Sequence, residues 1–379
     1  MDSKNSKRIV ALDLARCLAM IMMIQGHTVF ALVSPEAIDI SQFPWNVWNF
    51  LRGVTAPIFL LVSGASHVFA NKRAPDGSLP MATFKRRVRM SLMLMAVGYI
   101  LVFPAEKIYD LPFIDPSYFQ PFFSVNILQL FGVSLFMLTL LFYFTRSDRQ
   151  VAVGSLIIAS AITMLTPAVH AIDWFSILPN PIASYFSLER GSIFVIFPFT
   201  AFLFYGAALG IFLKNVEPAK RNALIIKWGG LAGIAIFAIG YPISLIFSNN
   251  PFLYFDALKV DPGLVFMRLG LVLMAIWFAA VVYSQTPKMG EYYSILGKKA
   301  LYIYVIHLLL IYGTPVFPGF EDFYFRNLTV PQSFAAAAIV ISATLGITFA
   351  LDYYQKTSRR ANDLFRYSLT AYLIYVFFI

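Results

Sequence analysis

The chain has few charged residues and almost no cysteine. Aspartate, glutamate, lysine and arginine make up 13% of its 379 residues, against 59% for hydrophobic residues. A soluble domain carries roughly 25% charged residues, so the composition excludes an ordinary soluble domain. The single cysteine, Cys17, excludes an internal disulfide. The composition therefore predicts an integral membrane protein that crosses the bilayer several times.

Several common catalytic and binding signatures are also missing. No GxxxxGK(S/T) or GxGxxG loop follows a predicted strand, so a glycine-rich phosphate loop is not expected. No GxSxG turn offers a serine nucleophile, and no cysteine, histidine or acidic residues show the spacing of a zinc site, so we expect no metal. These absences leave histidine as the best candidate for a general base or a transient acyl carrier.

Hydropathy predicts an all-α fold, a polytopic transmembrane helix bundle of about ten or eleven helices. The first apolar segment is too long for a signal-peptide core, so it is expected to be a retained span. Residues 368–379 form a short eleventh apolar segment whose status stays open. Because the loops are short, we expect a single integral-membrane domain over residues 1–379. The predicted spans lie near residues 9–34, 46–70, 90–105, 123–145, 151–169, 191–213, 224–247, 263–284, 300–317 and 332–354.

The lysines and arginines indicate the orientation of the chain. With the N-terminus inside, the internal segments hold most of the 29 lysines and arginines, whereas the external loops hold only Lys107, Lys259 and Arg326. The positive-inside rule applies because all loops are short. We therefore expect a multi-pass protein with a cytoplasmic N-terminus, in a bacterial inner or plasma membrane. This topology explains most of the net charge of +10, so a nucleic-acid partner is not expected.

The first predicted span carries three polar residues on one face. Arg16 and His27 are separated by ten residues. At ~100° and ~1.5 Å per residue, eleven helical steps return to the same stripe about 16 Å further along. Asp13 lies on this stripe, one turn before Arg16. Because such groups are costly in hydrocarbon, the stripe should line a polar cavity; the alternative is that Asp13 and Arg16 merely pair to lock helices together.

Further polar residues in the predicted spans are candidates for an acceptor site or cavity. Arg52 lies about two turns into the second span from the outside, near the depth of the first-span histidine. Glu189 and Arg190 lie at the outer end of the sixth span and Arg268 just inside the outer end of the eighth. Interfacial anchoring is the alternative for both arginines. His307 lies in the middle of the ninth span, where an interhelical hydrogen bond to serine, tyrosine or backbone is the alternative.

A basic cluster occupies the predicted cytoplasmic connection between the second and third spans. Residues 71–89 include Lys85, Arg86, Arg87 and Arg89, and contain a single acidic residue. The ordinary explanation is topogenic charge together with attraction to anionic membrane lipids. The sharper hypothesis is that these residues bind the phosphates of a soluble anionic donor, because arginine makes bidentate contacts with phosphate. A cytosolic acyl-CoA suits such a patch.

Several short motifs, taken in order, resemble those of a known family. The opening from Arg8 to His27 is similar to the R-x10-H signature of the acyltransferase-3 family. It also resembles the "slDxxRGxxmxxM" opening of the related heparan-α-glucosaminide N-acetyltransferase family. Residues 56–64, 126–132 and 296–307 are similar to the further segments "APxFxfxxG", "vLqxiG" and "lGrxSlyiYllH".

The resemblance implies transmembrane acyl transfer from a cytosolic acyl-CoA, expected to be acetyl-CoA, to a hydroxyl or amine of a sugar, glycan or small acceptor. His27 would remove the acceptor proton or carry the acyl group, Arg16 would orient the donor, and Asp13 would hold Arg16. The expected partners are membrane lipids, acyl-CoA and a carbohydrate or small-molecule acceptor, and a homodimer stays open. Two other classes also stay open: a polytopic transporter or lipid flippase, and a sensor that binds acyl-CoA or lipid without transferring anything.

Overall fold

The protein is represented by a computed structural model that describes residues 9–105, 107–247, 261–314 and 317–357, together with residues 360, 363, 367 and 368. Across these residues the regular structure consists of α-helices and short 3₁₀ turns, and one isolated bridge joins Val33 to Leu328 without forming a strand. The expected all-α fold is therefore confirmed.

The structure consists of long α-helices that are joined by short α-helices and 3₁₀ turns. The 3₁₀ turns lie at Pro35–Ala37, Ile108–Phe113, Pro116–Tyr118, Pro218–Lys220 and Pro287–Met289. The α-helices are α1 (Val10–Leu32), α2 (Trp45–Arg52), α3 (Thr55–Ala70), α4 (Met81–Ile100), α5 (Phe119–Phe123), α6 (Ile127–Phe144), α7 (Asp148–His170), α8 (Trp174–Ile177), α9 (Asn180–Ala183), α10 (Ile196–Lys214), α11 (Arg221–Phe247), α12 (Pro262–Gln285), α13 (Gly290–Lys298), α14 (Ala300–Tyr312), α15 (Phe320–Tyr324) and α16 (Val330–Thr357).

Eight segments within the described ranges are long and apolar enough to cross a bilayer. A ninth candidate consists of α13 and α14 together, which are bent by 68° relative to each other. A polytopic helix bundle is thus confirmed, whereas the expected count of ten or eleven spans is not. The eight segments are Val10–Leu32, Trp45–Ala70, Ile127–Phe144, Asp148–His170, Ile196–Lys214, Pro218–Phe247, Pro262–Gln285 and Val330–Thr357.

Two predicted spans differ from the helices that the structure contains. The predicted span near 90–105 corresponds to α4, which begins at Met81, so the basic run is itself helical and the apolar part of the helix is short. The predicted span near 300–317 corresponds to α14, which has 13 residues and ends where Gly313 adopts a φ of 72°. Both apolar stretches fall below the ~20 residues that a span needs. Residues 369–379 of the predicted eleventh segment lie outside the described residues.

The chain forms two compact units. The helices α3 to α12 belong to the first unit, whereas most of α1, together with α2 and α13 to α16, belongs to the second. A single integral-membrane domain over residues 1–379 stays a prediction. The first unit comprises Met1–Ala15, Ala56–Pro104 and Asp115–Gln285, and the second comprises Arg16–Thr55, Ala105–Ile114 and Thr286–Ile379.

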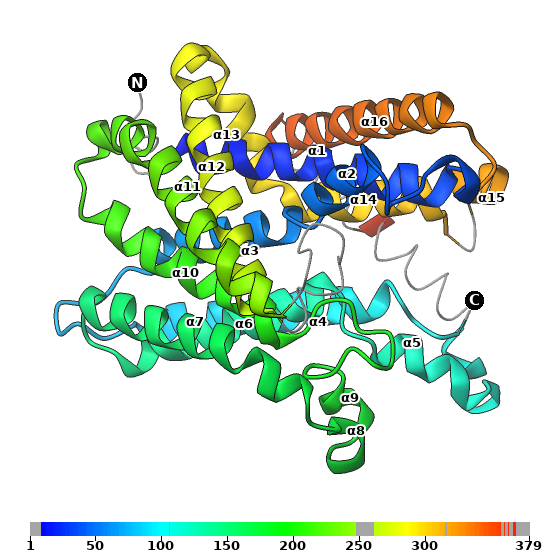
Figure 1. The fold of residues 1–379 in the computed structure, drawn as a ribbon, viewed down its shortest axis with the longest axis horizontal. Helices are drawn as coiled ribbons and strands as arrows, with labels where there is room; N and C mark the ends of the chain where they lie inside the picture. Colours follow the sequence, from blue (N-terminus) through cyan, green and yellow to red (C-terminus); the bar gives the residue numbers. More distant parts are fainter. Residues whose placement is uncertain are drawn as a thin grey trace. The chain divides into compact units, whose positions relative to one another are not determined.

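In the first unit, long helices pack in pairs, and α3 meets α10 through small residues. The pairs α11 with α12, α7 with α10 and α4 with α6 make the most extensive contacts, and Figure 1 shows α11 beside α12. A Cβ added to Gly206 of α10 would lie 1.9 Å from the carbonyl oxygen of Leu61 in α3, and one added to Gly64 would lie 1.9 Å from that of Leu203. The α3 and α10 backbones therefore touch directly, as small-residue interfaces between membrane helices permit.

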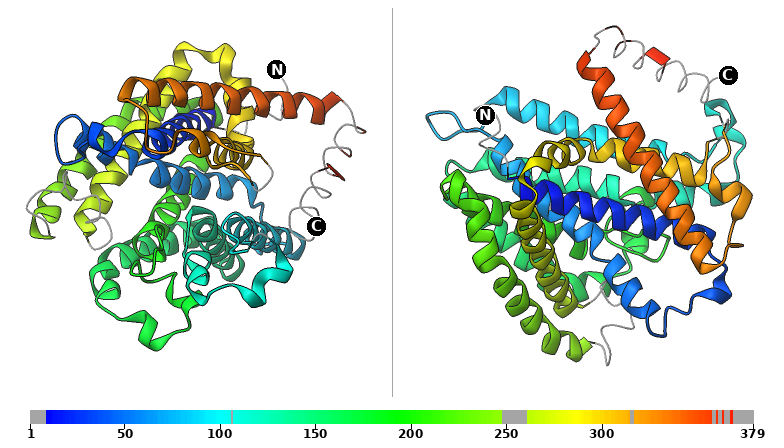
Figure 2. Two further views of the ribbon diagram at one scale, coloured as in Figure 1. Left: turned by 90° about the vertical axis from the view of Figure 1, so that its right-hand side faces the viewer. Right: turned by 90° about the horizontal axis from the view of Figure 1, so that it is seen from above.

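In the second unit, α16 packs against α13 and α14 (Figure 2). At the start of α14, Lys299 Nζ lies 3.5 Å from Asp352 of α16, whose carboxylate also pairs with Lys356 at 2.7 Å. At the end of α1, the amide of Ser34 donates to the carbonyl of Leu328 at 2.9 Å, just before α16 begins. Packing and polar contacts thus hold α1, α13, α14 and α16 in one unit.

Candidate functional site

The polar face of α1 contacts α13 and α14 within the second unit. Arg16 Nη1 donates a 2.9 Å hydrogen bond to the carbonyl of Gly297 in the last turn of α13. Further along α1, His27 Nδ1 lies 3.2 Å from Nε2 of His307 in α14. Arg16 and His307 are buried, whereas His27 is partly exposed. The two residues of the predicted stripe therefore contact two neighbouring helices.

These two contacts determine how α14 runs relative to α1. Arg16 and Gly297 are 281 residues apart in the sequence, and His27 and His307 are 280 apart. An advance of eleven residues along α1 is thus matched by an advance of ten residues along α13 and α14. Both contacts advance in the same chain direction, although Gly297 lies before the bend between α13 and α14. The chain from Gly297 to His307 therefore runs in the same direction as α1.

The hydrogen bonds of His307 determine which nitrogen of each neutral imidazole carries the proton. His307 Nδ1 lies 2.9 Å from the carbonyl oxygen of Ile303. A carbonyl only accepts, so this nitrogen carries the proton and Nε2 of the neutral ring holds a lone pair. His27 Nδ1 must then donate to His307, which leaves the lone pair of the His27 ring on its Nε2. This is the tautomer in which His27 Nε2 can accept a proton from a substrate.

Arg52, the last residue of α2, lies across α1 beside the position that precedes His27. Its guanidinium carbon is 4.9 Å from the ring centroids of both Phe30 and Trp48, a distance at which a cation is attracted to an aromatic face. A Cβ added to Gly26 would come within 2.9 Å of the Cγ and Cδ atoms of Arg52. Glycine at this position therefore leaves the room that the arginine side chain occupies.

Two hydrogen-bond donors in the same region have no acceptor among the described residues. Trp48 Nε1 donates to Gln25 Oε1 at 3.2 Å, which orients the glutamine amide. Gln25 Nε2 and Arg52 Nη1 are both buried, and neither has a hydrogen-bond partner in the part of the chain that the structure describes. Leaving a buried donor unsatisfied costs about 1–3 kcal/mol. Such groups call for an explanation, of which an acceptor atom on a ligand is one.

In the first unit, one member of the predicted basic cluster stabilises the end of a helix. Arg87 Nη2 donates to the carbonyl of Ala70, the last residue of α3, at 2.9 Å, and its Nε donates to Asn71 Oδ1 at 2.8 Å. These bonds satisfy groups that the helix end would otherwise leave without a partner. The other predicted donor-binding cations, which are exposed on α4, are Lys85, Arg86 and Arg89.

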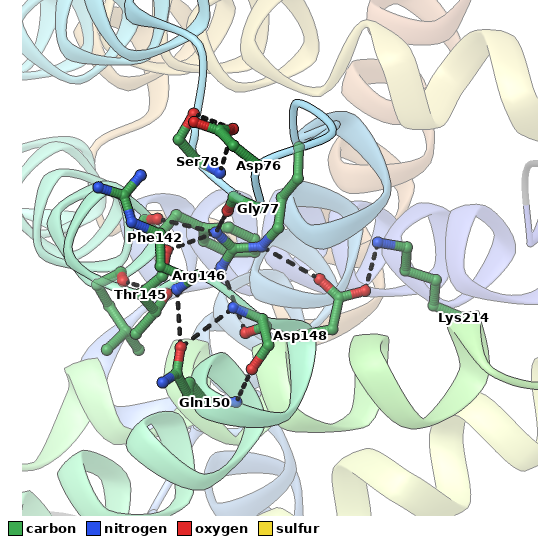
Figure 3. A network of polar contacts seen from close by, with 12 residues as sticks. Asp76, Gly77, Ser78, Phe142, Thr145, Arg146, Asp148, Gln150 and Lys214 are labelled. Carbon is green, nitrogen blue, oxygen red and sulfur yellow. Dashed lines mark hydrogen bonds and ion pairs between the residues drawn. The ribbon is translucent and has the colours of Figure 1, made fainter.

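Arg73 holds the connection between α3 and α4 against the start of α7. Its Nη1 donates to the carbonyls of Gly77 at 2.7 Å and Thr145 at 2.6 Å, and its Nε lies 3.5 Å from Asp148. Lys214 Nζ pairs with the same carboxylate at 2.6 Å (Figure 3). Partial burial lowers the pKa of the Arg73 guanidinium, and the Asp148 carboxylate partly offsets this. The network gives Arg73 a structural role.

The remaining predicted site residues lie in the first unit. Glu189 and Arg190 are exposed in the segment before α10. Arg268 of α12 is only 1% exposed, so the alternative of an interfacial anchor that reaches water is wrong for this residue. Asp13 is buried in the part of α1 that belongs to the first unit, and its pairing with Arg16 stays a prediction.

The described part of the chain contains no candidate group of metal ligands. No three or more histidine, cysteine, aspartate or glutamate side chains are placed there so that they could hold a metal ion. The expectation that the protein uses no metal remains a prediction.

Comparison with known proteins decides the family. Residues 8–232 match the family described as "Heparan-alpha-glucosaminide N-acetyltransferase, catalytic". The chain belongs to this family. The match confirms the resemblance read from the sequence motifs and makes the protein a multi-pass membrane protein of an acyltransferase family. Arg16, His27 and Arg52 lie inside the matched residues, whereas His307 lies beyond them. A comparison with curated proteins gives no match.

Not every residue near His27 was predicted from the sequence. His307 does bond across helices, but its partner is His27 rather than a serine, tyrosine or backbone group. Gln25 could have been predicted to have a polar partner, because an amide side chain inside a lipid-length helix needs one. No local signal distinguishes Gly26 or Trp48, since their roles depend on where Arg52 lies.

Proposed function

We propose that the protein transfers an acyl group, most simply acetyl, from acyl-CoA to a hydroxyl or amine of a sugar, glycan or small acceptor. The observation that carries this proposal is the hydrogen bond between His27 and His307, because it leaves a lone pair on His27 Nε2. Removal of the acceptor proton requires such a lone pair. Membership of the N-acetyltransferase family supports the class of reaction.

His27 is assigned the role of general base, and His307 positions it. As the acceptor oxygen or nitrogen attacks the acyl carbon, its proton moves to His27 Nε2, and the leaving thiolate takes up that proton when the tetrahedral intermediate collapses. The same lone pair also suits direct attack on the acyl carbon, which would make His27 a transient acyl carrier. Ping-pong kinetics would indicate the carrier; a requirement for both substrates to be bound together indicates the base.

The donor is assigned to the basic start of α4, which faces the cytosol if the N-terminus is cytoplasmic. Lys85, Arg86 and Arg89 are exposed, so their side chains are accessible to the phosphates of acyl-CoA. Arg87 is the weakest member of this patch because its guanidinium bonds the end of α3. Arg16 and Asp13 are assigned to positioning the donor arm. The bond from Arg16 to Gly297 supports a role for this arginine in fixing α1 as well.

The acceptor side is assigned to the surroundings of His27. Arg52 lies beside this residue in the second unit, which supports its place in the acceptor cavity. Glu189, Arg190 and Arg268 remain predicted cavity residues on the strength of their charge alone. Membrane lipids as partners, a homodimer, and a bacterial inner or plasma membrane as the location also remain predictions.

The test uses the full chain, purified in lipid nanodiscs, with radiolabelled acetyl-CoA and a panel of amino sugars and glycans. We expect acetylated acceptor and free CoA in equal amounts, and an about 10²–10⁴-fold slower reaction for His27→Ala. His27→Ala should still bind acetyl-CoA, because the imidazole contributes to chemistry rather than to holding phosphates. Acetyl-CoA binding without product would instead indicate a sensor, and movement of the acceptor across a vesicle membrane without acetylation would indicate a transporter.

A further inference from the structure

Arg52 has a buried hydrogen-bond donor, Nη1, that finds no acceptor within the described ranges of the chain. Its guanidinium lies over the rings of Phe30 and Trp48, which contribute no acceptor to Nη1. Burial of this atom without an acceptor is unfavourable, yet the side chain is held in place by the two rings and by the space that Gly26 leaves. A donor held rigidly at a cost to the free protein is suited to a group that appears only during binding or reaction.

Gln25 adds a second donor on the same indole. Its Oε1 accepts from Trp48 Nε1, so the amide NH₂ group points away from that bond and Nε2 is left buried without an acceptor. Gln25 and Arg52 both contact Trp48, and Arg52 covers Gly26, the residue between Gln25 and His27. Because two helical steps turn Gln25 by ~200° from His27, Arg52 Nη1 is the buried donor that lies beside the residue with the lone pair.

We propose that Arg52 is a further catalytic residue, which donates from Nη1 to the thioester oxygen as it becomes an oxyanion. This assignment rests on the proposed acyl transfer. Donors of this kind stabilise the transition state most when they are held in advance in a site with little water. The position of the Arg52 guanidinium against the rings of Phe30 and Trp48 supplies that rigidity.

Every bond, proton and electron pair of the transfer is accounted for by the acceptor, the thioester, His27 and Arg52. The acceptor oxygen or nitrogen forms a bond to the thioester carbon, and its proton moves to His27 Nε2. The electron pair of the C=O π bond moves to the oxygen, which accepts a hydrogen bond from Arg52 Nη1. When the pair returns, the C–S bond breaks, and the departing sulfur of CoA receives the proton from His27. No oxidant, reductant or metal takes part.

The test compares two substitutions that remove the donor in different ways. Arg52→Ala leaves a space that free guanidinium can enter, whereas Arg52→Met keeps an apolar chain across Gly26 and against the rings. With acetyl-CoA and glucosamine as substrates, both variants should lower kcat by about 10²–10³-fold, as loss of one oxyanion donor does. The KM values for both substrates should stay close to those of the wild type, because the interaction forms only in the transition state.

Guanidinium at sub-denaturing concentration should restore part of the activity of Arg52→Ala and none of Arg52→Met. The matched control is Arg149→Ala, since Arg149 is an exposed arginine at the start of α7; its kcat should equal that of the wild type with or without guanidinium.

Several results would overturn the proposal. The first is a kcat of Arg52→Met equal to that of the wild type, and the second is a raised KM for glucosamine with unchanged kcat in either Arg52 variant. The third is a loss of activity in Arg52→Ala that guanidinium does not reverse. If Arg52→Ala fails to fold, the Arg52→Met result decides, with the melting midpoint as the check on folding. A wild type that acetylates no acceptor in the panel of amino sugars and glycans would refute the proposed function itself, and this assignment with it. An active wild type with equally active Arg52 variants refutes this assignment alone.

Discussion

Replacing His307 by leucine removes the acceptor that holds the Nδ1 proton of His27. The leucine side chain fills a similar volume in the buried position, but it offers no lone pair. His307→Gln is the matched variant, because its amide oxygen can reach toward the position of the lost Nε2 and accept the same proton. We expect kcat to fall for His307→Leu and to stay within about threefold of the wild type for His307→Gln.

The size of the loss follows from the hydrogen bond. Leaving a buried N–H group without an acceptor costs about 1–3 kcal/mol, and this is the free energy that holds His27 in the tautomer with its lone pair on Nε2. Because ~1.4 kcal/mol corresponds to a tenfold change in rate, the expected fall in kcat is about 10–100-fold. This loss is smaller than that expected for His27→Ala, because His307 acts only through His27.

The assay is the initial rate of acetyl transfer from acetyl-CoA to glucosamine by protein in nanodiscs. A double variant with His27→Ala and His307→Leu should be no slower than His27→Ala alone, since the positioned group is already absent. Gel filtration and the melting midpoint show whether each variant folds. Equal kcat values for His307→Leu and the wild type, or losses that multiply in the double variant, would refute the assigned tautomer and the positioning role.

Three further predictions concern donor binding, packing and topology. Replacing Arg86 and Arg89 together by glutamine should raise the dissociation constant of acyl-CoA tenfold or more, because each charge-assisted hydrogen bond contributes ~1.5–3 kcal/mol. An unchanged affinity, measured by calorimetry, would leave these residues with a topogenic role only. Gly206→Ala should destabilise the protein by about 1–3 kcal/mol, seen as a lower melting midpoint, whereas Gly346→Ala, where an added Cβ meets nothing within 4 Å, should not. A reporter inserted at Asp76 should read cytoplasmic, and an external signal would contradict the expected orientation.

Hydropathy predicted the long apolar helices well because their length has to match the bilayer. The spans expected at 151–169 and 263–284 correspond to α7 (Asp148–His170) and α12 (Pro262–Gln285). The pattern failed where a helix is not apolar throughout. It placed the start of the third span near residue 90, because hydropathy does not detect helical turns composed of lysine and arginine.

The candidate site was predictable only where its residues share one helix. Arg16 and His27 repeat at a helical spacing, so the sequence places them on one face of α1. The contact between His27 and His307 joins residues 280 positions apart, and no local pattern specifies such a pairing. Arg52 was predicted as a site residue because it is a charged residue in a span. The end of α2 at this residue, and the position of its side chain against Gly26, depend on tertiary packing.

The two contacts that α1 makes, with Gly297 at the end of α13 and with His307 in α14, give the R-x10-H spacing a physical reason. Arg16 fixes the start of this pairing through Gly297, and His27 meets His307 at its other end. One residue inserted between Arg16 and His27 would turn the later part of α1 by ~100° and advance it by ~1.5 Å. Only one of the two contacts could then form. The spacing therefore links a buried structural bond at one end to the orientation of the proposed base at the other.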